Sequence, residues 1–184
     1  MVNTVIFLPL LIVSGLCYVI QPKSKKSLNI ILFLIFLGLK KKKIKQMIEC
    51  FCHFFLSYYT PFHDVTNILE KHLNNGNHVV IISGSPMEFL EIIYPHFFNN
   101  ENITIIASKT QYALFSFFLK ERCIFLNKKK MLDAYFKIEM AFYEGYSDSS
   151  MDLPILIRCR SAFLVDKVGR VEKINNKIFD DSYN

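Results

Sequence analysis

Two apolar stretches dominate the hydrophobic pattern of the first quarter of the chain. Residues 5–20 and 28–39 contain no charged side chain, and a short basic link joins them. As helices they would be about 24 and about 18 Å long at ~1.5 Å per residue, shorter than the roughly 30 Å apolar core of a bilayer. The pattern therefore predicts a shallow helical hairpin that dips into one leaflet, with a single membrane-crossing pass as the alternative.

Two other interpretations of this segment are weaker. A cleavable signal peptide is disfavoured because the first four residues carry no Lys or Arg, and no small residue directly precedes Cys17. A buried helix pair in a soluble protein is the other possibility. Against it, four lysines directly follow the second apolar stretch, at 40–43, which is typical of a membrane edge.

Beyond residue 60 the pattern changes to short apolar runs that alternate with amphipathic segments. Apolar residues at helical spacing predict helices at 64–73, 87–98, 128–140 and, more briefly, 154–159. Short β-branched runs predict strands at 78–83, 103–108, 161–166 and just before Gly145, while 114–126 suits either a strand or a helix. Alternation of this kind predicts a Rossmann-like layered α/β fold.

Charge is unevenly divided along the 184 residues. Eight of the 22 Lys and Arg residues precede Glu49, whereas all 16 Asp and Glu residues lie at or after it, so the net charge of +6 belongs to the apolar first quarter. A basic segment within apolar sequence indicates an anionic lipid surface as partner and argues against nucleic acid. A hydrophobic fraction of 52% also excludes a disordered chain.

The five cysteines form no CxxC pair, and an odd number suits a reducing compartment. Cys50, Cys52 and His53 are close enough in sequence to suggest a metal site. On a helix, however, spacings of one and two residues point to different faces, so helix packing is the favoured interpretation.

Polar clusters follow the predicted strands, where α/β folds bind ligands. The first is Ser83-Gly84-Ser85-Pro86, which could hold a phosphate through the Ser83 hydroxyl and backbone N–H groups, or could be an ordinary strand-to-helix turn. The second contains Asp148 and Asp152, two carboxylates suited to Mg²⁺. A helix N-cap formed by Asp is equally consistent with this second cluster.

The third cluster is the lysine run at 128–130, which begins a predicted helix between the other two. Such a run is usually a solvated face. One of the three lysines could instead reach inward as the cation that binds a phosphate.

In order and spacing, the three clusters resemble motifs II, III and IV of the haloacid dehalogenase superfamily of phosphohydrolases. They read ISGSP, the lysine of RCIFLNKKKML, and GYSDSSMDLPIL, of which the last is the most specific. Within subfamily IB, the chain most resembles phosphatidylglycerophosphatase C-like enzymes, lipid phosphatases of the bacterial inner membrane. The resemblance spans most of residues 5–175. It implies a three-layer α/β core over 61–184 and a helical membrane-anchoring cap over 1–60.

The resemblance also implies a chemistry. In the family, a motif I Asp attacks the phosphoryl group, and a second Asp two residues later acts as general acid and base. Carried over to this sequence, Ser83 and the Gly84 amide bind the phosphate. Lys128 offsets its charge, or Lys129 or Lys130 does so if the register shifts.

The motif IV acids complete the implied site. Asp148 ligates Mg²⁺ directly, and Asp152 contributes to the metal site or orients Lys128.

Motif I, of the form DxDGT, is absent, because no acidic residue precedes Glu49. Its strand should lie between those that carry motifs II and IV. Without it, facing backbone groups lack partners at a cost of about 1–3 kcal/mol each when buried. We therefore expect a truncated chain with little or no activity.

The expected function is that of a membrane-associated, Mg²⁺-dependent phosphatase that converts phosphatidylglycerophosphate to phosphatidylglycerol. Its expected place is the bacterial inner membrane, with the core facing the cytoplasm. The alternatives are a phosphoserine-phosphatase-like hydrolase with a soluble substrate, and a non-catalytic remnant that binds phosphate or lipid.

Overall fold

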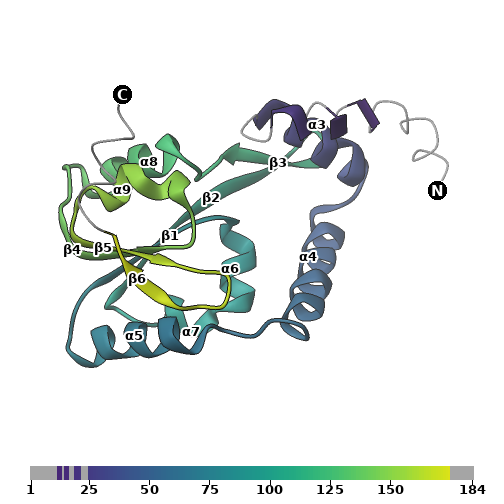
Figure 1. The fold of residues 1–184 in the computed structure, drawn as a ribbon. Coiled ribbons are helices and arrows are strands. Elements are labelled where there is room, and N and C mark those ends of the chain that lie inside the picture. The colour runs from purple at the N-terminus through teal and green to yellow at the C-terminus, as the bar shows by residue number, and fades with distance from the viewer. Residues whose placement is uncertain (1–11, 14, 17–18, 22–24, 175–184) are drawn as a thin grey trace. The chain divides into compact units, whose positions relative to one another are not determined.

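The computed structural model describes residues 12–13, 15–16, 19–21 and 25–174, which form two compact units (Figure 1). Unit 1 comprises the described residues up to Tyr58 together with Gly84–Pro95 and Ala107–Ile124. Unit 2 comprises Tyr59–Ser83, His96–Ile106 and the described residues from Phe125 onward. The first unit is therefore not a contiguous N-terminal segment, because two later stretches join it.

Helices and strands alternate through most of the described chain. The helices are α3 (Lys25–Phe36), α4 (Lys41–Leu56), α5 (His63–Asn74), α6 (Met87–Ile93), α7 (Pro95–Phe98), α8 (Leu126–Phe136) and α9 (Leu153–Leu156), with a 3₁₀ turn η1 (Ser150–Asp152). The strands are β1 (Val79–Pro86), β2 (Ile103–Ala113), β3 (Ser116–Glu121), β4 (Phe142–Ser147), β5 (Cys159–Val165) and β6 (Val171–Lys173).

The core of unit 1 forms around one face of α4. Ile44, Ile48 and Cys52 recur every four residues, so they share a face, and all three are buried. Aromatic and aliphatic side chains of α6 and of the β2–β3 hairpin pack against them. Cys52 is thus a packing residue, whereas Cys50 is exposed. The two cysteines therefore lie on different faces of α4, as their spacing predicts.

A hairpin of β2 and β3 completes unit 1. The strands are antiparallel, with Tyr112 opposite Phe117 and Ala113 opposite Ser116. Helix α3 lies along β3, because the Asn29 side chain donates to the Leu119 carbonyl at 3.0 Å and accepts from the Leu119 amide at 2.8 Å. These two hydrogen bonds of Asn29, a polar residue in a largely apolar helix, hold α3 against β3.

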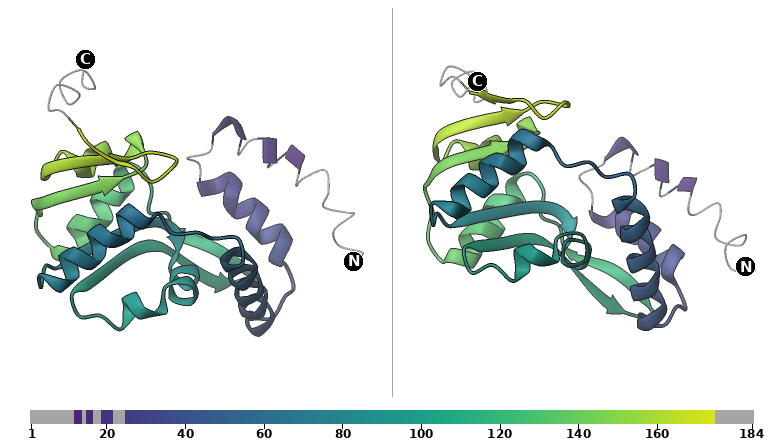
Figure 2. Two further views of the ribbon diagram at one scale, coloured as in Figure 1. Left: turned by 60° about the horizontal axis from the view of Figure 1, so that its bottom comes forward. Right: turned by 90° about the horizontal axis from the view of Figure 1, so that it is seen from below.

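Unit 2 contains a three-stranded sheet in the order β4-β5-β6, whose strands lie side by side in Figure 2. β4 and β5 are parallel, and β6 is antiparallel to β5. The short crossover from β4 to β5 contains η1 and α9. Leu156 of α9 is buried with Ala162 and Ile174, and this contact holds the crossover against the sheet.

The mixed α/β fold class is confirmed, and the described strands form two three-stranded sheets. Among the described residues, β1-β2-β3 and β4-β5-β6 are separate sheets, with β1 and β4 as outer strands. The parallel pairing expected of a layered core is present between β4 and β5.

Several predicted boundaries need correction. The helix predicted at 87–98 is divided at Tyr94, because Pro95 cannot donate a backbone hydrogen bond and disfavours helical geometry in the residue before it. The ambiguous stretch 114–126 forms the hairpin turn, β3 and the start of α8. The helix predicted at 128–140 ends at Phe136, where Lys137 takes a left-handed conformation. The C-terminal strand β6 was not predicted.

No helix in the described parts of the chain is long and apolar enough to cross a membrane. The first predicted apolar stretch, 5–20, lies largely outside the described residues. The second coincides mostly with α3, which has no fully buried residue.

Candidate functional site

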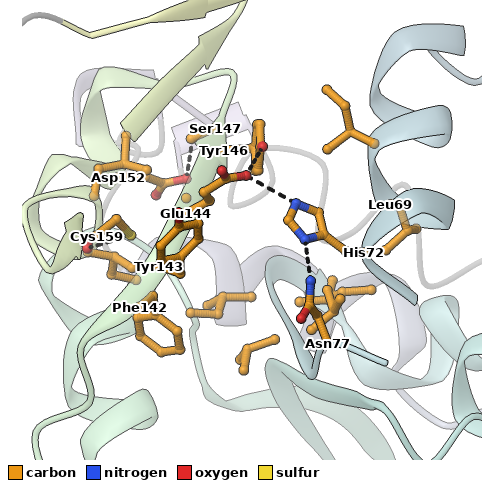
Figure 3. Close-up of a pocket in the computed structure, with 18 of the residues that line it drawn as sticks. Leu69, His72, Asn77, Phe142, Tyr143, Glu144, Tyr146, Ser147, Asp152 and Cys159 are labelled. Carbon is orange, nitrogen blue, oxygen red and sulfur yellow. Dashed lines mark hydrogen bonds and ion pairs between the residues drawn. The ribbon is translucent and has the colours of Figure 1, made fainter. Parts of the chain in front are cut away.

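A cavity of about 810 Å³ lies within unit 2 (Figure 3). One part of its wall is apolar and comes from the inner face of α5 and from β1 residues 79–82. The opposite part comes from β4 residues 142–147 and from the following η1–α9 segment. The cavity is thus bordered by β1 and β4, which are outer strands of two separate sheets.

The predicted lysine and the second motif IV carboxylate meet in this cavity. Lys128 Nζ lies 2.7 Å from Asp152 Oδ2, and only 13% and 16% of the two side chains are exposed. The Ser147 hydroxyl donates to the same Asp152 oxygen at 2.8 Å. A charge-assisted bond this short holds the ammonium group at one position, and the hydroxyl fixes the carboxylate in turn.

Local sequence explains why Asp152 turns inward. The Ser147 hydroxyl also accepts from the Ser149 amide at 3.1 Å, and the Ser149 hydroxyl accepts from the Met151 amide at 3.2 Å. Ser149 therefore caps η1, and Asp152 makes no capping bond. The alternative that an Asp caps this helix is wrong, because a serine satisfies the amide and leaves the carboxylate for the lysine.

The position of Lys128 among three consecutive lysines is decided by the packing of α8. Arg158, only 7% exposed, donates to Asp133 at 2.5 Å and to Glu139 at 2.8 Å, which anchors this helix. Lys129 lies 3.7 Å from Glu139, and Lys130 is exposed. The guanidinium lowers the pKa of Asp133, mainly through its hydrogen bond.

Asp148 occupies a different environment from Asp152. Its side chain is exposed, and no hydrogen bond or ion pair is found for it in the described parts of the chain. Mg²⁺ in proteins is commonly held by one or two carboxylates, with water and substrate phosphate as its other ligands. Asp148 follows directly after β4 and has a carboxylate of the kind that could serve as such a ligand, but it is not among the residues that line the cavity. Asp152 fits less well as a direct ligand, because Lys128 and Ser147 both occupy one of its oxygens.

The predicted phosphate loop differs from expectation. β1 continues through Ser83 and Gly84 to Pro86, so these residues are extended and do not form an open turn. The Ser108 hydroxyl donates to the Gly84 carbonyl at 2.7 Å, and a Cβ at Gly84 would meet Ile124 at 3.2 Å. Ser83 is half-buried and is not among the residues that line the cavity. Gly84, which belongs to unit 1, is not among these lining residues either.

A second polar network in the cavity was missed from the sequence. Glu144 Oε2 lies 3.1 Å from His72 Nε2 and accepts from the Tyr146 hydroxyl at 2.5 Å, and the other ring nitrogen of His72 contacts Asn77 (Figure 3). Burial first, and the Glu144 contact second, raise the pKa of Tyr146 well above its usual value. The signal that could have found it is the two-residue spacing of Glu144 and Tyr146, which puts both on one face of a strand.

Cys159 also borders the cavity but is not suited to nucleophilic chemistry. Burial raises the pKa of its thiol to about 11, so the thiol is protonated at neutral pH. Gly145 allows its close approach, because a Cβ at that position would collide with the Cys159 sulfur.

Unit 2 thus places the shielded Lys128 ammonium and the Ser147 hydroxyl around Asp152, just beyond the carboxyl end of β4. The sequence model of one family, haloacid dehalogenase-like hydrolase, matches residues 12–156. The chain belongs to this family. No solved structure matches it significantly.

Proposed function

We propose that this chain is a membrane-associated, phosphatase-type protein that binds the phosphate of a phospholipid, with phosphatidylglycerophosphate as the substrate and phosphatidylglycerol as the product. Membership in a hydrolase family supports the reaction class. The observation that carries the proposal is the shielded pair of Lys128 and Asp152 beside Ser147. An ammonium group has three donors, and Asp152 takes only one, so the others can bind phosphoryl oxygens.

Each residue of this cluster has a distinct part in the proposed binding. Lys128 binds the phosphoryl group and offsets its negative charge. Asp152 is a positioning residue that holds Lys128, and Ser147 holds Asp152. Asp148 would hold Mg²⁺, which when bound neutralises charge on the phosphoryl oxygens.

The chain by itself is expected to release little or no phosphate. Residues 1–48 contain no carboxylate and so supply no aspartyl nucleophile. Cys159 does not replace it, because its thiol is protonated at neutral pH. The lack of carboxylates in residues 1–48 also favours the second candidate, a protein that binds phosphate or a lipid headgroup without hydrolysing it.

The proposed location is the cytoplasmic side of a bacterial inner membrane. This part of the proposal rests on the sequence, in which the basic and apolar residues of the first quarter occur together.

Phosphate release from phosphatidylglycerophosphate by the purified chain with Mg²⁺ tests the reaction. We expect turnover close to the uncatalysed background. Substantial turnover that Asp148→Asn abolishes would contradict the proposed inactivity, because the metal carboxylate would then be serving an active enzyme. Turnover of phosphoserine but not of the lipid would instead favour the soluble-substrate alternative.

Phosphate binding can be measured even if the chain does not turn over. Calorimetric titration with glycerol 3-phosphate and Mg²⁺ should show binding that Lys128→Met weakens about tenfold, since a charge-assisted bond is lost. Lys130→Met is the matched control, because it removes an exposed lysine from the same helix. Equal affinity in the two variants would reject the assigned site.

A further inference from the structure

The turn between β2 and β3 presents two large apolar side chains to solvent. Leu114 is 76% exposed and Phe115 is 75% exposed, and they are the two residues between paired Ala113 and Ser116. At this exposure, packing against the described residues does not explain why apolar side chains occupy this turn.

The backbone of this turn is also unfavourable for these residues. Leu114 and Phe115 have φ angles of 49° and 55°, in the left-handed region that bulky residues rarely adopt. Two-residue hairpin turns with positive φ at both positions normally contain Asn-Gly or Asp-Gly. Large apolar residues held in a strained and exposed position indicate a use for the side chains themselves.

Hydrogen bonds bring the loop between α3 and α4 to this tip. The Gly38 amide donates to the Phe115 carbonyl at 2.8 Å, and the Tyr112 hydroxyl donates to the Leu39 carbonyl at 2.8 Å. The lysine run at 40–43 follows directly, and all four residues are exposed. Within the described chain, no carboxylate forms an ion pair with these four lysines. The apolar tip therefore has a dense positive charge beside it.

We propose that the β2–β3 tip, Leu114 and Phe115, inserts into the interface of a bilayer that contains anionic lipid, with the lysines at 40–43 bound to the headgroups. Such a surface supplies an apolar layer and a layer of negative charge a short distance apart. A second copy of the chain is a poor partner for this surface, because the lysine runs would repel each other. The inference relies on the membrane location proposed above and not on the phosphatase reaction.

A single fluorophore tests the insertion directly, because the chain contains no Trp. In Phe115→Trp the indole should shift its emission to shorter wavelength when vesicles of equal parts phosphatidylglycerol and phosphatidylcholine are added, and lipids brominated on their acyl chains should quench it. Tyr135→Trp on α8 of unit 2, also an exposed position, is the control and should show neither effect. An indole at residue 115 that stays in water with bound vesicles would overturn the proposal.

Vesicle co-sedimentation of the full chain measures how much the tip contributes. Leu114→Asn with Phe115→Gly creates the preferred turn sequence, so it should fold at least as well while binding the same vesicles about tenfold more weakly. Replacing the lysines at 40–43 with Gln should remove the preference for phosphatidylglycerol over pure phosphatidylcholine vesicles. Unchanged binding of the turn variant, or no binding of the unaltered chain, contradicts the proposal. Neither outcome depends on phosphate release, which is assayed separately.

Discussion

Both units of this protein have a buried apolar core, but they differ in the groups that surround it. Unit 1 buries Ile44, Ile48 and Cys52 under aromatic residues and exposes apolar groups at its hairpin tip. In unit 2, bonded charged groups line the cavity and anchor α8, and Arg158 is among the least exposed of them. Unit 1 thus exposes apolar groups suited to a surface, whereas unit 2 adds to its apolar core a set of bonded charged groups suited to chemistry. This division predicts that the two units respond differently to mutation, salt and pH.

Ile44→Ala should have the largest effect and tests the apolar side of the comparison. The side chain is 2% exposed, so its truncation leaves a cavity and should lower the free energy of unfolding by about 3 kcal/mol. Urea unfolding measures the loss, which should not change with salt. Met47→Ala, an exposed position on the same helix, is the control. Equal losses in the two variants would contradict the assignment of the core.

Arg158→Met tests the polar side in the same way. It removes the guanidinium from Asp133 and leaves Glu139 only its longer contact with Lys129, and because both carboxylates retain access to water the loss of unfolding free energy should be about 2 kcal/mol. Arg160→Met is the control, because Arg160 is exposed and only stacks over Tyr143. In contrast to Ile44→Ala, the difference between Arg158→Met and the unaltered protein should shrink at high salt. If this difference in unfolding free energy does not change with salt, the contrast between the two units is contradicted.

We expect the Asp133 carboxylate to make the unfolding free energy of unit 2 depend on pH in the acid range. Its pKa is lowered from 3.8 in the folded protein, mainly by the Arg158 hydrogen bond. The stabilisation is therefore complete above the unfolded pKa and is lost as pH falls through the lower folded value. Asp133→Asn should flatten this part of the curve of unfolding free energy against pH. A curve of unchanged slope would show that another carboxylate is responsible.

Tyr146→Phe should have the smallest effect of the four. It removes one partly buried hydrogen bond to Glu144, at a cost of about 1 kcal/mol. The raised pKa of Tyr146 favours its neutral form in the folded state. Stability should therefore fall as pH rises above 10, and it should fall less steeply in the variant. Ultraviolet titration of tyrosinate should show one late-titrating group fewer.

Local pattern was sufficient for much of the fold. The helix at His63–Asn74 and the strands that begin at Val79 and Ile103 agree closely with the sequence, because burial on one face leaves a clear period in the residues. The motif around Asp148 and Asp152 was also visible, since its residues are neighbours in the chain. Prediction failed at Tyr94, where Pro95 interrupts a helix, and at 114–126, where short apolar runs suit either structure.

What the sequence by itself determined is therefore local: the α/β alternation, the order of the motifs, and the separation of a basic apolar segment from a mildly acidic remainder. Only the tertiary structure decided that Lys128 and not its neighbours meets Asp152, that His72 meets Glu144, and that the hairpin tip adjoins the lysine run. Each of these contacts joins residues between 24 and 77 positions apart, from Lys128–Asp152 to Gly38–Phe115. Periodicity shows which face of an element is buried, but the partner across that face depends on how whole elements pack.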